Sequence, residues 1–159
     1  MNLRWLAPLL SLGLPSATLA AQGNASPASP ASPALPPRRT IAVGDTLRDS
    51  LTRKNVLLPA DSTYAQEFRL AGRAGETVTI DLAADAFDAY VFLLGPGFDA
   101  APPQDDDSGG HCNARLTVRL PRAADYIIVA TSRERFAKGP FTLSVTAGPK
   151  PASLAPCNR

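Results

Sequence analysis

The chain has little of what most catalytic or nucleic-acid-binding sites require. Its 159 residues include one histidine, one tryptophan and two cysteines, and its formal net charge at pH 7 is only +2. A charge this close to zero gives no reason to expect a nucleic-acid partner. One histidine and two cysteines also fall short of the roughly four side-chain ligands of a structural zinc site.

Recognisable catalytic motifs are missing as well. The sequence contains no nucleophile elbow, no HExxH pair and no phosphate-binding glycine motif. Ser108 and His111 lie beside aspartates, but all of them crowd onto one turn, whereas triad members normally come from separate segments around a pocket. We therefore expect a protein that is not an enzyme, and a hydrolase is the least favoured interpretation.

Long apolar runs are scarce, and the clearest one lies at the N-terminus. Trp5–Leu14 is too short to span a membrane, which needs roughly 20 apolar residues. Arg4 precedes the run, and small residues ending at Ala20 follow it. This pattern predicts a signal peptide over residues 1–20, cleaved after Ala20. The mature chain would then be secreted or periplasmic, without a transmembrane segment and without tryptophan.

The next segment, residues 21–38, differs in composition from the rest. Gln22–Pro37 is QGNASPASPASPALPP, which has no charged residue and almost no large apolar one. Such a stretch cannot bury enough apolar surface to fold, and its prolines favour an extended chain. We predict a disordered Pro/Ala/Ser linker here.

Residues 39–148 carry the pattern of β-strands. Apolar and polar residues alternate with a period of two, which is typical of strands with one buried and one solvated face. The stretches with this alternation are Tyr64–Leu70, Thr77–Leu82, Arg115–Leu120 and Phe141–Thr146. Two other runs, Ala89–Leu94 and Tyr126–Ala130, are apolar on both faces and predict central strands that are covered on both sides.

The strand count and the turns define the fold class. Thr40–Val43 and Leu47–Leu51 add further strands, glycine- and proline-containing turns separate the runs, and no stretch has helical periodicity. The sequence therefore predicts an all-β domain over 39–148, an antiparallel β-sandwich or jelly roll of seven to eight strands.

The two cysteines are Cys112 and Cys157. Disulfides persist in exported proteins, so we expect a bridge that pins the C-terminal tail, residues 149–159, to the domain. Two free thiols are the alternative.

Asp88, Asp105, Asp106 and Asp107 form the densest acidic group. Adjacent aspartates repel one another, and a hard cation such as calcium would relieve the repulsion through oxygen ligands. The alternative is a solvated turn whose aspartates accept hydrogen bonds from local backbone amides. Calcium is thus the one cofactor that the sequence suggests.

An ordered series of segments resembles the bacterial pre-peptidase C-terminal (PPC) domain family. The segments are Gly44–Leu47, Phe87–Leu93, Asp105–Gly110, Asn113–Leu116, Leu120–Pro121, Asp125–Ser132 and Gly139–Leu143. The resemblance implies a β-sandwich of the kind appended to secreted proteases and implicated in secretion, substrate attachment or maturation. In this sequence the module follows a signal and a linker rather than a protease.

The resemblance extends in fold to the collagen-binding domains of clostridial collagenases, which implies that a tyrosine on a sheet face contacts an extended protein. The candidates are Tyr64, Tyr90 and Tyr126. We expect a monomeric accessory module that binds a protein, either a secreted enzyme or its substrate, or a cell-envelope polymer. The alternative is a structural envelope protein without a discrete ligand.

Overall fold

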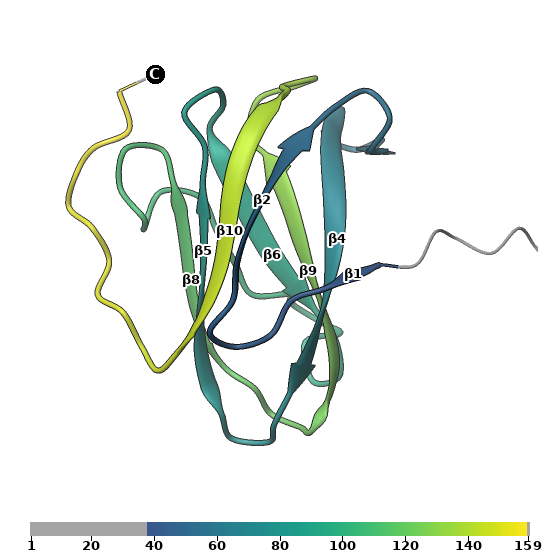
Figure 1. Cartoon of the computed structure of the whole chain (residues 1–159), viewed down its shortest axis with the longest axis vertical. Helices are drawn as coiled ribbons and strands as arrows, with labels where there is room; N and C mark the ends of the chain where they lie inside the picture. The colour runs from purple at the N-terminus through teal and green to yellow at the C-terminus, as the bar shows by residue number, and fades with distance from the viewer. Residues whose placement is uncertain (1–37, 159) are drawn as a thin grey trace, which may run out of the picture. The chain divides into compact units, whose positions relative to one another are not determined.

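The structure is a computed structural model that describes residues 38–158 (Figure 1). The predicted signal peptide, residues 1–20, and all of the predicted linker except Arg38 lie outside the described residues. Within residues 38–158 we find no helix of the length and apolarity needed to cross a membrane.

Ten strands form two sheets, which confirms the all-β prediction. The first sheet has the order β1-β4-β9-β6-β7, with β3 also paired to β4; the second has the order β2-β10-β5-β8. Figure 1 shows the second sheet in front of β6, β9 and β4. Their bounds are β1 Arg39–Thr40, β2 Thr46–Leu51, β3 Val56–Leu58, β4 Thr63–Gly72, β5 Thr77–Ala83, β6 Ala89–Leu94, β7 Gln104–Asp105, β8 Ala114–Arg119, β9 Ala124–Ser132 and β10 Gly139–Ala147.

The pairing is antiparallel except between β1 and β4, which run parallel. The sequence predicted seven to eight strands. The three shortest strands, β1, β3 and β7, have only two or three residues each. A segment that short cannot show a period of two, so the count from sequence came out lower.

The core lies between the two sheets and is built from alternate residues of each strand. In the second sheet Ile80 pairs with both Val145 and Leu116, so the inner-facing residues line up across three strands. The inner residues of β4, β6 and β9 meet them from the first sheet. The rings of Phe68 on β4 and Phe141 on β10 pack edge to face, 6.2 Å between centroids, and join the two layers.

Tyr126 is the largest fully buried side chain of the core. Its ring lies against Gly72 and Gly95, where an added Cβ would come within 2.9 Å and 2.4 Å of ring atoms. Its hydroxyl donates to the Arg122 carbonyl oxygen at 2.9 Å. The two glycines are therefore required by the close approach of the tyrosine ring.

The C-terminal tail follows β10 without regular structure and runs beside β8 (Figure 1). The structure joins Cys157 of the tail to Cys112 in a disulfide. The Ser153 amide donates to the Ser108 carbonyl at 2.8 Å, and the Arg115 guanidinium donates to the Pro151 carbonyl at 2.8 Å. Covalent and hydrogen bonds thus hold the tail along the second sheet and its neighbouring loop.

Candidate functional site

The outer side of the first sheet is apolar. Because Ala89, Val91 and Leu93 of β6 face the core, Tyr90, Phe92 and Leu94 face away from it. Their cross-strand neighbours on β9 face the same way: Phe92 pairs with Val129, and Leu94 pairs with Ile127. We call the outward-facing apolar residues of this sheet the apolar face; they are Val56, Ala65, Tyr90, Phe92, Leu94, Ile127 and Val129. Glu67 and Arg69 of β4 also face outward, beside Val129 and Ile127.

Several members of the apolar face contact solvent. Val56 is 57 % exposed and Leu94 36 %, while Tyr90, Phe92 and Ile127 are partly exposed. Val129 and Ala65 are buried between larger neighbours. The prediction that Ala89–Leu94 and Tyr126–Ala130 are covered on both sides is therefore wrong for the outer side of β6 and for Ile127, whereas Val129 is buried on its outer side as well. A contiguous apolar surface of this kind marks an interaction site more often than scattered exposed residues do.

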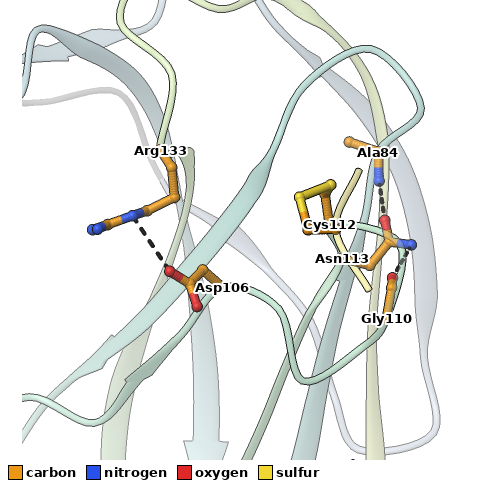
Figure 2. The surroundings of a disulfide bond; sticks show 7 residues. Ala84, Asp106, Gly110, Cys112, Asn113 and Arg133 are labelled. Atoms are coloured by element: carbon orange, nitrogen blue, oxygen red, sulfur yellow. Dashed lines mark hydrogen bonds and ion pairs between the residues drawn. A yellow bond between two sulfur atoms is a disulfide. The ribbon is translucent and has the colours of Figure 1, made fainter. Parts of the chain in front are cut away.

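Tyr90 forms the polar end of the apolar face. The Arg133 guanidinium lies over the Tyr90 ring at 5.0 Å from its centroid and forms an ion pair with Asp106 at 3.4 Å (Figure 2). The Tyr90 hydroxyl donates to the Gln104 side-chain oxygen. Burial raises the pKa of this hydroxyl, and the nearby Arg133 charge opposes the rise. The ring is thus held in place from two sides.

A hollow of about 190 Å³ opens beside this ring. It is lined by Asp61, Tyr90, Ser132 and Arg133. The hollow combines an aromatic wall, a carboxylate and a guanidinium, so it is suited to one polar or charged side chain rather than to a large ligand.

Asp88 lies at the start of β6, close to the same corner. Its Oδ1 atom is buried and has no hydrogen-bond partner among the described residues. Burial raises the pKa of the Asp88 carboxyl, and the charges of Asp107, Asp106 and Glu134 raise it further, whereas Arg133 lowers it. Negative charge therefore accumulates here.

The four aspartates predicted to hold calcium have different surroundings. Asp105 accepts hydrogen bonds from the backbone amides of Arg115 at 2.7 Å and Ser108 at 3.1 Å, as in the alternative of a capped acidic turn. Asp106 pairs with Arg133, as described above. Asp107 lies close to the sulfurs of Cys112 and Cys157, but these are joined in the disulfide and cannot serve as ligands. Calcium binding stays a prediction.

The three predicted tyrosines also differ. Tyr126 is 0 % exposed and is not available to a partner. Tyr64 packs against the edge of the core, with its ring 6.4 Å from that of Phe136. Only Tyr90 faces outward from the centre of a sheet. Sequence reasoning did not single out Phe92, Ile127 or Arg133, although the two-sided apolar runs were the signal that could have found the first two.

The fold, then, is a two-sheet β-sandwich with an apolar outer face on one sheet. No protein-family model and no curated protein matches the sequence. Among solved structures, the chain is similar to the pre-peptidase C-terminal domain of a collagenase from Bacillus anthracis, with 13 % identity and a TM-score of 0.48 over 71 % of this chain and 100 % of that one. It is also similar to a periplasmic inhibitor of g-type lysozyme (PliG) from Aeromonas hydrophila, with 19 % identity and a TM-score of 0.46 over 69 % of this chain and 96 % of that one.

Proposed function

We propose that this chain is a non-catalytic exported module that binds a protein through its apolar face. The single observation that carries the proposal is the row of partly exposed apolar side chains, Tyr90, Phe92, Leu94 and Ile127, on the outside of a two-layer sandwich. Leaving such side chains in water forgoes roughly 25 cal/mol per Å² of apolar surface, which a partner's surface recovers on binding. Protein interfaces are enriched in tyrosine, phenylalanine and arginine, and all three are present here.

A protein partner fits the face better than an envelope polysaccharide does. Sugar-binding surfaces use exposed aromatic rings as stacking platforms together with polar side chains for the hydroxyl groups. On this face the Arg133 guanidinium lies over the Tyr90 ring, and Phe92 lies between Val129 of β9 and Gln104 of β7. An extended protein segment requires less polar pairing and suits a broad apolar strip.

The disulfide between Cys112 and Cys157 supports a role outside the cytoplasm, because such bonds persist in oxidising compartments. The partner is therefore a protein of the exported compartment, either a secreted enzyme or its substrate. The structural envelope role remains the competing function, and the experiment below separates the two.

The test is a pull-down from the exported proteins and the envelope fraction of the producing cell. Three forms of the chain are compared: the natural protein, Phe92→Arg on the apolar face and Ser144→Arg on the outer side of β10. We expect one defined exported protein to bind the natural chain and Ser144→Arg but not Phe92→Arg, whose fold is checked by circular dichroism. Equal capture by Phe92→Arg would refute the proposed face. Recovery of wall material alone would favour the structural role.

A further inference from the structure

The charges along most of the apolar face are balanced. At the β4 edge Arg38 pairs with Glu67, and Arg69 pairs with Asp125 at 3.3 Å. Each pair joins one acidic and one basic side chain, so this part of the face carries no excess charge.

The end of the face near Tyr90 is different. Within residues 38–158, five carboxylates there take part in no ion pair; they are Asp61, Asp88, Asp105, Asp107 and Glu134. Against them stand Arg135, whose guanidinium lies over the Phe136 ring at 5.9 Å, and Lys138 of the same loop, neither of which takes part in an ion pair with another described residue. Since Arg133 and Asp106 neutralise each other, the carboxylates outnumber the cations at this end.

The hollow beside Tyr90 places one of these carboxylates where a partner can reach it. Asp61 is exposed and lines the hollow together with Tyr90. Arg133 shows that a guanidinium fits on this ring when a carboxylate stands nearby, because it lies over Tyr90 and pairs with Asp106. Asp61 brings a second carboxylate to this hollow and takes part in no ion pair among the described residues, although Arg133 also lines the hollow and Arg135 donates to the hydroxyl of the neighbouring Ser62 at 3.4 Å.

We propose that the apolar face takes an extended segment of an exported protein that carries a lysine or arginine next to apolar residues, and that this cation enters the hollow and pairs with Asp61, beside the Tyr90 ring over which Arg133 lies. The inference rests on the proposed function, to which it adds the chemistry of the partner. Complementary charge speeds encounter and rejects partners of the wrong sign.

Other occupants of the face lack the complementary charge. An acidic segment would bring carboxylates to a site that already has an excess of them. A second copy packed face to face about a two-fold axis would bring the same unpaired carboxylates. The chain's own residues from Gln22 to Pro37 include no lysine or arginine. A basic segment of a different protein is the occupant that satisfies both the apolar and the charged parts of the surface.

The experiment selects binders from a library of random 12-residue peptides displayed on phage, using the purified exported protein as bait. Selected peptides are synthesised with a fluorescent label and titrated by anisotropy against the natural protein and three variants. Asp61→Asn removes the proposed partner of the cation, Asp99→Asn removes a charge beyond the opposite end of β6, and Phe92→Arg disrupts the apolar face. The two aspartates are exposed, so neither substitution should affect folding.

We expect selected peptides to contain more lysine and arginine than the starting library, beside apolar residues. Asp61→Asn should weaken their binding about 3- to 10-fold, Asp99→Asn should leave it unchanged, and added salt should weaken binding to the natural protein more than to Asp61→Asn. Selected peptides that are acidic or neutral would overturn the inference, and so would equal affinity of the peptides for Asp61→Asn and the natural protein. If Phe92→Arg still abolishes binding in either case, the proposed function stands. Binding that survives Phe92→Arg would overturn the proposed function itself.

Discussion

The two sheets of the sandwich have similar inner faces and opposite outer faces. Both turn aliphatic and aromatic side chains toward the core. On the outside, the second sheet presents threonine, serine, arginine and aspartate, namely Thr46, Arg48, Thr79, Asp81, Arg115, Thr117, Arg119, Thr142, Ser144 and Thr146. The first sheet presents the apolar face, with the paired charges of Glu67, Arg69 and Asp125 along its β4 side. Packing of the core does not require this difference, so the apolar side chains outside β6 and β9 are explained better by binding than by folding.

Hydrogen bonds and ion pairs within the chain satisfy the polar side chains on the outer face of the second sheet. Thr79 bonds to the Thr117 hydroxyl at 2.9 Å and to the Gly148 carbonyl at 2.8 Å. Asp81 pairs with Arg115 on β8 and with Lys150 in the tail, each at 2.6 Å. The tail thus completes the hydrogen bonds and ion pairs of the second sheet, whereas the apolar face is left for a partner. The predictions below test this contrast.

The largest expected effect comes from removing the disulfide. Cys112 and Cys157 are 45 residues apart in sequence, and closing a loop of that length is worth about 4 kcal/mol in the chain-entropy model. We expect the double variant Cys112→Ala/Cys157→Ala to lose up to that free energy of unfolding in urea titrations. Amide exchange should increase most at His111 and Ser153, where the tail meets its loop, and least at Phe92 and Val129. Uniform loss of protection in both sheets would contradict a tail that serves the second sheet.

The second prediction concerns the apolar face without any partner. If Phe92 and Ile127 serve binding, the double variant Phe92→Thr/Ile127→Thr should fold and lose only about 1 to 2 kcal/mol, because both side chains are already partly exposed. Retention on a hydrophobic-interaction column should fall at the same time. A loss of 4 kcal/mol or more, the usual range for large core side chains, would show that these residues belong to the core and would remove the contrast between the sheets.

The strand pattern was predictable because a period of two shows directly wherever the outer residues are polar, as in β5, β8 and β10. The same pattern did not show which residues of β6 and β9 face the core. In a run that is apolar on both sides, nothing in the sequence says which residues face inward, so Tyr90 and Tyr126 were equivalent candidates. Their positions along the strands separate them: Tyr126 pairs with the buried Leu70 of β4 and faces the core, whereas Tyr90 lies between the inward-facing Ala89 and Val91 of β6 and therefore faces outward. The rule that two-sided apolar strands are covered twice belongs to parallel sheets, and β6 and β9 are antiparallel.

The site at Tyr90 was even less accessible from the sequence. Arg133 belongs to a charged loop that looked solvated, and its contacts with Tyr90 and Asp106 join residues far apart along the chain. Asp105 accepts hydrogen bonds from two backbone amides, one of them in its own turn, as the alternative to calcium describes, and the other from Arg115 on β8. These are long-range or local-turn geometries for which composition and spacing give no signal.

The third prediction tests the charged pairs of the polar face. Asp81→Asn removes the carboxylate that pairs with Arg115 and Lys150, and the Asp81 side chain is 17 % exposed. We expect a loss of about 1 kcal/mol in the free energy of unfolding, reduced by added salt. As a matched control, Asp125→Asn removes a largely exposed partner of Arg69 and should change stability by much less. Equal effects would mean that the tail contact through Lys150 adds nothing to the second sheet.

The smallest effect on the free energy of unfolding is expected for Asp88→Asn. Its sign distinguishes a calcium-free from a calcium-bound state of the carboxylates around Asp88. Because burial and the charges of Asp107, Asp106 and Glu134 raise the pKa of Asp88 above 3.8, the folded chain keeps this proton to higher pH than the unfolded chain does. The stability that Asp88 contributes is therefore complete below pH 3.8 and is lost as the pH rises through the raised pKa. Without a bound cation, the free energy of unfolding at pH 7 should be slightly larger for Asp88→Asn than for the natural protein. This difference should disappear in acid.

Calcium would reverse that sign. A bound cation stabilises the folded state only while Asp88 and its neighbours are ionised, so the natural protein would gain stability on adding calcium at pH 7 and the Asn variant would not. The measurement is urea unfolding at pH 7 with calcium or with a chelator, for the natural protein, Asp88→Asn and Asp106→Asn. If calcium leaves the free energy of unfolding of the natural protein unchanged, the calcium site is excluded. The unpaired carboxylates would then remain for a basic partner, whose binding at Asp61 should in turn lower the cost of ionising Asp88.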